Sequence, residues 1–332
     1  MKMSEIKRTM IAGTGSYVPE RLLTNADLEG MVETSDEWIR TRTGIEERHI
    51  AAPEQATSDL AFQAAQRALE SAGISADELG LIIVGTVTPD HFFPNTACIL
   101  QQKLGAANAF CFDIEAACSG LLYAMTVADS LLKTKGALKY ALVIGAEKLS
   151  GLVNWQDRNT CVLFGDGAGA VVLKVTDVDR GIIGSELRSD GVHTSLLKAE
   201  AGGSRLPLTA ENINDNLQCI SMAGREVFKL AVNAMVDSSL KVLAEHNMSA
   251  ADLRWIVPHQ ANARIIKAVA QRLEASEEQV YMNVNRYGNT SSASIGLCLD
   301  EMNRKGLVKP GDKVLLTSFG AGMTWGSLLI QW

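Results

Sequence analysis

The sequence predicts an α/β protein made of two similar halves. Apolar runs of strand length alternate with amphipathic helical stretches along the 332 residues, the pattern of a protein with buried sheets. Two pairs of segments also repeat in the same order along the chain, which indicates internal duplication. The composition, 47% apolar and 21% charged, supplies enough apolar side chains for a substantial core.

The individual strands and helices are predicted from periodicity. Residues 81–84, 141–144 and 314–317 form short apolar runs that are typical of buried strands. Between residues 58 and 71 the apolar side chains recur near helical spacing, and Gly73 then supplies a C-terminal stop. The apolar positions of this helix are Leu60, Ala61, Ala64, Ala65, Ala68 and Leu69.

The internal repeat defines the expected architecture. Residues 75–86 align without gaps to residues 249–260, and residues 164–173 resemble residues 319–330 with a two-residue insertion. One such match between strand-turn-strand passages is expected by chance, but two matches in the same order favour duplication. We therefore predict halves at 1–175 and 176–332, a pseudo-twofold core, and a site at their junction.

Charge and cysteine usage exclude several classes of protein. A net charge of −7 argues against general nucleic-acid binding, which requires a basic surface. The six cysteines contain no C-x-x-C pair, so neither a zinc site nor a dense disulfide framework is expected. The first eight residues lack the apolar stretch of a signal peptide, and no apolar run approaches the roughly 20 residues of a spanning helix. We expect a cytoplasmic protein with reduced thiols and no membrane contact.

Cys118 is the strongest candidate for chemistry. It follows the apolar run 110–112 and precedes a helical pattern, which places its sulfur at a helix start. There the positive end of the helix dipole favours thiolate, so we expect a lowered pKa and a nucleophilic sulfur. The alternative, a packed core cysteine, fits the other five cysteines better. These are Cys98, Cys111, Cys161, Cys219 and Cys298.

His259 and Asn289 are the next candidates. His259 follows a predicted strand and replaces Gly85 of the first repeat, which indicates a specialised position rather than a structural histidine. Asn289 lies among small polar residues that open a predicted helix. Taken alone, such an asparagine is an ordinary turn or cap, and it becomes informative only together with Cys118 and His259.

At this point the chain resembles the thiolase-fold condensing enzymes, specifically the β-ketoacyl-acyl carrier protein synthase III family. The resemblance covers nearly the whole chain and includes the Cys118 segment. The other matching segments are residues 34–39, 41–45, 164–169, 258–262, 288–291 and 319–326. It implies a layered α-β-α-β-α core and a Cys118-His259-Asn289 site. It also implies that Cys118 takes an acyl group from acyl-coenzyme A, with acetyl-coenzyme A as the expected donor, to initiate fatty acid synthesis.

The implied second step is a condensation with malonyl-acyl carrier protein. Loss of carbon dioxide leaves an enolate that attacks the acyl group on Cys118, while neutral His259 and Asn289 donate hydrogen bonds to the enolate oxygen. Backbone N–H groups of Cys118 and Ala321 are expected to form the oxyanion hole. Ala321 occupies a position that is often glycine in the family, and its methyl group restricts the turn.

The resemblance also implies binding residues. Trp38 and Arg158 are expected to flank the coenzyme A adenine, with Arg42 and Thr43 nearby and Asn262 at the pantetheine end. In the acyl pocket we expect Phe319, together with Phe93 reaching across a homodimer interface. The alternative for these aromatic and arginine side chains is a half-buried or solvated surface.

An acidic carrier protein is expected to bind a basic surface, and two pairs of basic residues at helical spacing are candidates for it. These pairs are Arg225 with Lys229 and Arg264 with Lys267. The alternative is that all four are ordinary solvated charges.

Other functions are less consistent with the sequence. The nearest rival is a thiolase-fold acyltransferase of secondary metabolism that uses a different acceptor. A cysteine hydrolase disagrees with the residue order and the duplicated halves, and a catalytically dead scaffold disagrees with the complete Cys118, His259 and Asn289 set. Residues 13–18 lack the third glycine of a dinucleotide fingerprint. We expect no metal and no prosthetic group.

Overall fold

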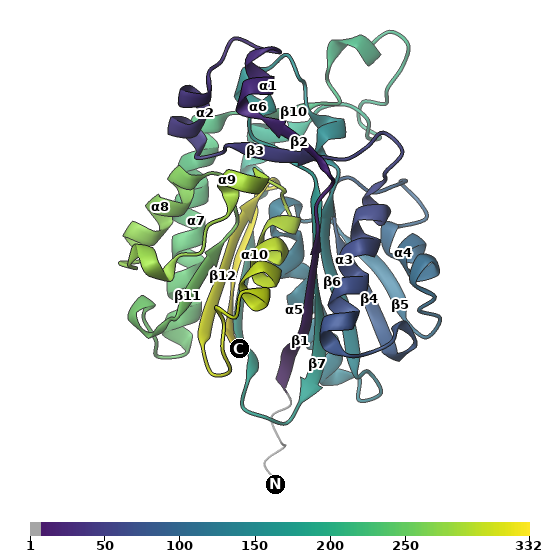
Figure 1. Cartoon of the computed structure of the whole chain (residues 1–332), viewed down its shortest axis with the longest axis vertical. Helices are drawn as coiled ribbons and strands as arrows, with labels where there is room; N and C mark the ends of the chain where they lie inside the picture. Colours follow the sequence, from purple (N-terminus) through teal and green to yellow (C-terminus); the bar gives the residue numbers. More distant parts are fainter. Residues whose placement is uncertain (1–7) are drawn as a thin grey trace.

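The computed structural model describes residues 8–332, and two β-sheets form its centre (Figure 1). The first sheet contains, in spatial order, β1 (Arg8–Tyr17), β7 (Gly167–Thr176), β6 (Tyr140–Glu147), β4 (Leu79–Gly85) and β5 (Phe110–Ile114). The second contains β11 (Trp255–Pro258), β12 (Lys313–Gly320), β13 (Thr324–Gln331) and β8 (Gly181–Ser189). The three strands predicted from apolar runs are thus confirmed as parts of β4, β6 and β12.

The two sheets share one topology. In the first sheet β1 is antiparallel to β7, β7 is antiparallel to β6, and β6 is parallel to β4. In the second sheet β8, β13, β12 and β11 repeat these relations in the same order. The first sheet adds β5, which lies parallel to β4. This equivalence confirms the duplicated α/β halves, whereas the boundary between residues 175 and 176 stays a prediction.

Helices complete five layers (Figure 1). The first sheet is covered on its outer face by α3 (Thr57–Ala72) and α4 (Thr96–Leu104), and α5 (Gly120–Thr134) and α10 (Ala293–Arg304) lie between the sheets. The second sheet is covered by α7 (Gly224–Glu245), against which α8 (Ala263–Arg272) packs. The observed order is therefore the expected α-β-α-β-α core. Its central apolar cluster includes Leu81, Val143, Leu122, Met125, Leu299, Val257, Leu316 and Leu328.

The α3 helix shows how sequence pattern becomes packing. All six predicted apolar positions are buried, and the helix ends at Gly73 in the left-handed conformation. Gly13 and Gly15 of β1 lie directly under this helix. A Cβ atom at Gly15 would lie 2.2 Å from the Ala64 carbonyl oxygen, so only glycine permits this close approach. Gly13 and Gly15 therefore serve helix packing. This agrees with the sequence, which lacks the third glycine of a dinucleotide-binding motif.

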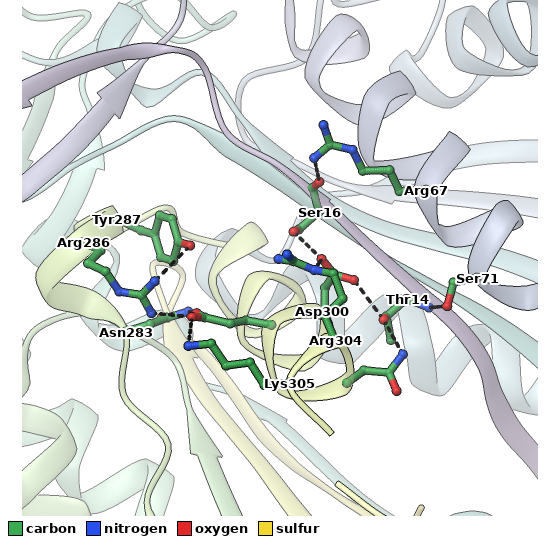
Figure 2. A network of polar contacts seen from close by, with 12 residues as sticks. Thr14, Ser16, Arg67, Ser71, Asn283, Arg286, Tyr287, Asp300, Arg304 and Lys305 are labelled. Atoms are coloured by element: carbon green, nitrogen blue, oxygen red, sulfur yellow. Dashed lines mark hydrogen bonds and ion pairs between the residues drawn. The ribbon is translucent and has the colours of Figure 1, made fainter. Parts of the chain in front are cut away.

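The central helix α10 is fixed by charged side chains at its carboxyl end (Figure 2). Asp300 accepts hydrogen bonds from Thr14 at 3.0 Å and from Ser16 at 2.5 Å, both on β1. Glu301 accepts from Arg286 at 2.6 Å and from Lys305 at 2.5 Å. The helix that follows Asn289 is therefore tied to both halves of the molecule.

Most of the remaining helices and strands lie at one end of the two sheets (Figure 1). The remaining elements are β2 (Arg21–Thr24), α1 (Asn25–Glu29), α2 (Asp36–Thr43), β3 (Glu47–Ile50), α6 (Arg158–Cys161), β9 (Leu197–Ala199), β10 (Ile220–Met222) and α9 (Val284–Tyr287). Two of them, β9 and β10, belong to the segment that connects β8 to α7. Seven residues of the amino-terminal segment used in the signal-peptide expectation lie outside the described residues. Within residues 8–332, no helix combines the length and apolarity needed to cross a membrane.

Candidate active site

Cys118 lies where the two halves meet. A 3₁₀ turn at Ala117–Ser119 leads from β5 into α5, which confirms the predicted helix start. The turn is held by the β12–β13 hairpin of the other half, because the Ser318 hydroxyl donates to the Cys118 carbonyl oxygen at 2.7 Å. The Thr324 hydroxyl donates to the Ala116 carbonyl oxygen, also at 2.7 Å.

Close backbone packing fixes the same turn. A Cβ atom at Gly320 would lie 2.6 Å from the Cys118 backbone nitrogen, so this hairpin position requires glycine. Ala117 is held at φ +45°, in the left-handed region that costs a non-glycine residue energy. Contacts from both halves therefore set the position of the sulfur.

The expected lowering of the Cys118 pKa is wrong. Burial raises the pKa of Cys118 to about 12, and the negative charges of Glu147 and Glu115 act in the same direction. A hydrogen bond from Ser291 and the backbone N–H at the helix start lower the pKa, but they do not offset the loss of solvation. The thiol consequently needs a proton acceptor when it reacts.

His259 follows β11 and is 2% exposed. Its Nδ1 lies 2.7 Å from the Ser294 hydroxyl, and its backbone N–H donates to the Thr317 carbonyl oxygen. Burial lowers the pKa of His259 to about 3, so the imidazole is neutral at physiological pH. The equivalent Gly85 of the first half packs on Gly120, where a Cβ atom would lie 2.7 Å from backbone. This contact explains why only the second half has room for a histidine.

Asn289 is buried in the loop that leads into α10. Its backbone pairs with the segment after α6, because its N–H donates to the Leu163 carbonyl and its carbonyl accepts from Gly165. The Ser291 backbone N–H donates to Asn289 Oδ1 at 2.9 Å. Since that contact requires the amide oxygen, the Nδ2 group must point the other way.

A single pocket joins these three residues. Its volume is about 1490 Å³, and Cys118, His259 and Asn289 all line it. The first comes from the amino-terminal half and the other two from the carboxy-terminal half. The structure thus brings together the predicted catalytic set. Other predicted residues on the pocket wall are Trp38, Arg42, Thr43, Asn262, Phe319, Ala321, Arg225, Lys229 and Arg264.

The predicted adenine site is closed in this structure. The Arg158 guanidinium lies 4.8 Å from the centroid of the Trp38 ring, and Arg42 lies 5.8 Å from the same centroid. A base between two stacking partners needs about twice a van der Waals contact distance of roughly 3.5–4 Å. Trp38 and Arg158 therefore stack on each other here, and adenine cannot lie between them without their separation.

The side chains of Thr43 and Asn262 form local hydrogen bonds that the sequence did not reveal. The Thr43 hydroxyl donates to the Ile39 carbonyl oxygen at 2.7 Å and accepts from the Ile45 N–H. Asn262 caps α8, because its Oδ1 accepts from the Ile265 N–H at 2.9 Å. Thr43 therefore lines the pocket without a free hydroxyl group. Asn262 has only its Nδ2 group available to bind a substrate.

The two phenylalanines predicted for the acyl pocket lie in different places. Phe319 of β12 is buried and lines the pocket beside Cys118. Phe93 is 86% exposed and lies outside this lining, whereas its neighbour Phe92 reaches the pocket. Phe93 therefore does not contact the acyl site of its own chain.

The predicted basic patch is divided between two packed helices. Arg225 and Lys229 project from α7, and Arg264 and Lys267 from α8. All four are exposed, and none forms an ion pair with an acidic side chain within residues 8–332. Lys267 alone lies outside the pocket lining.

Sequence reasoning missed Glu147, Ser291 and Ser294. Ser291 and Ser294 stand within a polar segment that was read only for Asn289. Glu147 ends the strand whose core was predicted at residues 141–144, and it is completely buried. A fully buried carboxyl group is uncommon, and a glutamate that ends an apolar strand was the available signal.

Comparison with known proteins agrees with this geometry. The family model "3-Oxoacyl-[acyl-carrier-protein (ACP)] synthase III" matches residues 112–191, and its C-terminal counterpart matches residues 243–332. A β-ketoacyl-[acyl-carrier-protein] synthase III of Caldanaerobacter subterraneus is 53% identical over 322 residues, covering 97% of each chain. That of Xanthomonas campestris pv. campestris is 52% identical over 330 residues, covering 99% of this chain and 100% of the relative.

Solved structures give the same result. The crystal structure of 3-oxoacyl-[acyl-carrier-protein] synthase III from Aquifex aeolicus VF5 is 47% identical, with a TM-score of 0.91. The match covers 98% of this chain and 100% of that one. With this identity across nearly its whole length, and a cysteine, histidine and asparagine on one pocket, the chain belongs to the β-ketoacyl-acyl carrier protein synthase III family of condensing acyltransferases.

Proposed function

We propose that Cys118 takes an acyl group from acyl-coenzyme A, with acetyl-coenzyme A as the expected donor, and condenses it with malonyl-acyl carrier protein. The observation that carries this assignment is the placement of Cys118, His259 and Asn289 on one pocket between the halves. The relatives are named as β-ketoacyl-acyl carrier protein synthases, so a different acceptor in secondary metabolism is not favoured.

In the first half-reaction the Cys118 sulfur attacks the thioester carbonyl carbon. One thioester replaces another, so the acyl group is held without a large change in free energy. Negative charge develops on the carbonyl oxygen, and the backbone N–H groups of Cys118 and Ala321 are the proposed donors. Each such donor stabilises the transition state by roughly 3 kcal/mol.

In the second half-reaction malonyl-acyl carrier protein loses carbon dioxide and forms an enolate. Neutral His259 can donate a hydrogen bond to the enolate oxygen from Nε2, because Nδ1 already contacts Ser294. Asn289 can donate from Nδ2, because Oδ1 is held by the Ser291 N–H. Two neutral donors favour the enolate without transferring a full proton.

The mouth of the pocket accommodates the coenzyme. We propose that Trp38 and Arg158 part to admit the adenine between them, and that Arg42 meets a phosphate group. Thr43 and the Asn262 Nδ2 group then lie along the pantetheine arm, which leads to Cys118. The proposed reaction uses no metal and no prosthetic group; acyl-coenzyme A enters as a substrate and coenzyme A leaves as a product.

Partners and location are part of the same proposal. The exposed ring of Phe93 supports a homodimer in which it closes the partner's acyl pocket. Arg225, Lys229, Arg264 and Lys267 are proposed to receive the acidic carrier protein. All six cysteines are free thiols, which supports a reducing compartment such as the cytoplasm.

Two measurements test the function. Incubation with acetyl-coenzyme A should add one acetyl group to the intact mass, peptide mapping should place it on Cys118, and Cys118→Ala should take up none. Malonyl-acyl carrier protein should then release carbon dioxide in step with the β-ketoacyl product. Acyl transfer to a different acceptor without carbon dioxide would contradict the proposed reaction.

A further inference from the structure

Glu147 is a buried carboxyl group whose charge acts on the Cys118 thiol. It ends β6, and its side chain is 0% exposed. Oε2 accepts hydrogen bonds from the amino-terminal half, namely from the Thr88 hydroxyl at 2.8 Å and the Val87 N–H at 3.1 Å. Oε1 contacts two hydroxyls of the carboxy-terminal half, Ser291 at 3.1 Å and Ser292 at 2.9 Å.

The contacts of Ser292 indicate that this carboxyl group can hold a proton. A serine hydroxyl carries a single hydrogen atom, yet Ser292 Oγ lies 2.8 Å from the Gly85 carbonyl oxygen and 2.9 Å from Glu147 Oε1. Both partners are pure acceptors while Glu147 is ionised. A proton on Oε1 supplies the hydrogen atom that the second contact lacks. In agreement, burial raises the pKa of Glu147 to about 7.

Ser291 connects this carboxyl group to the thiol. Its hydroxyl donates to Glu147 Oε1 at 3.1 Å and is a hydrogen-bonding neighbour of the Cys118 sulfur, so its lone pairs can accept from the S–H group. Its backbone N–H holds the Asn289 amide. Ser291 is 2% exposed and has a left-handed φ of +49°, so its hydroxyl is kept between the two groups and away from bulk water.

We propose that Glu147 accepts the proton of the Cys118 thiol through Ser291 and is thereby a positioning residue for the first half-reaction. This inference rests on the proposed function of Cys118. As the sulfur bonds to the thioester carbon, its S–H bond breaks and the proton passes to Ser291 Oγ. The original Ser291 hydroxyl proton passes to Glu147 Oε1. The negative charge of Glu147 thus moves to the carbonyl oxygen.

The return step balances the first one. Collapse of the tetrahedral intermediate breaks the bond to the coenzyme A sulfur, which takes a proton from Ser291 as Glu147 returns its own. The carboxylate is restored, the thiol form of coenzyme A leaves, and no other reactant is needed. Because the proton stays within three side chains, the buried site never holds two negative charges at once.

The other ionisable groups near the thiol do not serve as this acceptor. His259 is neutral, but burial lowers its pKa to about 3, so it binds a proton weakly. Glu115 is exposed and its Oε1 accepts from the Ala117 backbone N–H. Lys148 follows Glu147, but its ammonium group donates to the carbonyl oxygens of Ala52, Pro53 and Gln55. Glu147 is the group whose pKa matches neutral pH.

The test measures single-turnover acetylation of Cys118 by acetyl-coenzyme A between pH 5.5 and 9, using quenched intact-mass analysis. In the wild type the rate should rise with pH to a plateau, with a midpoint near the pKa of about 7, because the acceptor must be ionised. Ser291→Ala should remove this step and lower the plateau at least about a hundredfold. It retains the backbone N–H that holds Asn289.

Ser292→Ala is the matched control, since it removes the other hydroxyl from the same carboxyl oxygen without breaking the path to Cys118. It should keep the step with a changed midpoint, because Ser292 is one of the groups in contact with the carboxyl oxygen. Glu147→Gln should behave like Ser291→Ala if it folds. A wild-type rate without the step, or a step retained in Ser291→Ala, overturns the inference. Absence of acetylation of wild-type Cys118 instead contradicts the proposed function.

Discussion

The Ser318 hydroxyl donates a hydrogen bond to the Cys118 carbonyl oxygen at 2.7 Å. A strand of the carboxy-terminal half thereby holds the turn on which the amino-terminal half carries Cys118, its proposed nucleophile. Together with the glycine contact at Gly320, this bond makes the position of the sulfur depend on how the halves pack.

Ser318→Ala should therefore affect both stability and acylation. Loss of one buried hydrogen bond should lower the free energy of unfolding by about 1 kcal/mol, and the freed turn should slow acetylation of Cys118 severalfold. Ser327→Ala is the control, because Ser327 is buried on β13 and contacts only other hydroxyls. It should lose at least as much stability in urea unfolding and keep its acetylation rate. Equal acetylation by both variants would contradict a role for Ser318.

Removal of the proposed enolate donors, His259 and Asn289, should separate the two half-reactions. His259→Ala and Asn289→Ala should still acquire an acetyl group on Cys118, because neither residue is needed for that transfer. Condensation should fall by about a hundredfold or more, the usual effect of deleting one oxyanion donor. Rapid-quench measurement of both steps checks this. Unchanged carbon dioxide release from malonyl-acyl carrier protein would exclude the proposed roles.

Trp38→Ala should weaken coenzyme A binding. Stacking of a base on an aromatic ring is worth about 1–3 kcal/mol, partly offset here because Trp38 gives up its contact with Arg158. We expect KM for acetyl-coenzyme A to rise about tenfold with little change in kcat, and KM for malonyl-acyl carrier protein to stay constant. Steady-state kinetics in each substrate decides this. If both KM values rose together, Trp38 would have a general structural role instead.

Charge reversal on α8 should act on the carrier alone. Lys267 is exposed and lies outside the pocket lining, so Lys267→Glu should raise KM for malonyl-acyl carrier protein about fivefold and leave acetylation by acetyl-coenzyme A unchanged. The effect should shrink at high salt. Lys309→Glu, at an exposed position after α10, is the matched control. A similar rise in both variants would point to net charge rather than a docking surface.

Glu301 should make the fold sensitive to acid. Burial alone raises its pKa, but hydrogen bonds from Lys305, Asn283 and Arg286 prevail and lower the pKa to about 2. Because the folded pKa lies below the ordinary glutamate value of 4.5, the stabilisation is complete above pH 4.5 and disappears as pH falls towards 2.

Urea unfolding of the wild type and Glu301→Gln at several pH values tests this. The wild type should lose up to about 3 kcal/mol more than the variant across that interval. The variant should also be less stable than the wild type at pH 7. Parallel curves for the two proteins would show that the Glu301 pKa does not differ between the folded and unfolded states.

Much of the fold could be predicted because its strands and helices follow from local patterns of apolar residues. The apolar runs within β4, β6 and β12 and the helical spacing within α3 each reflect burial of that segment alone. The repeat of residues 75–86 at 249–260 preserved even the small capping boxes, Ser75 with Glu78 and Ser249 with Asp252. Such features depend on neighbours along the chain, so a single sequence reveals them.

The sequence by itself determined the residue types available to the site, and the resemblance to family motifs predicted Cys118, His259 and Asn289 as its catalytic residues. Only the tertiary structure decided their chemical state. The raised pKa of Cys118 and the neutral state of His259 depend on burial by elements far away in sequence, and Glu147 and Ser294 are among the distant groups that act on these two residues. The Asn289 amide is oriented by its near neighbour Ser291, but only in the loop conformation that the fold imposes. The physical reason is that solvation and hydrogen bonding in a buried site are set by all the elements that surround it, and these come from both halves of the chain.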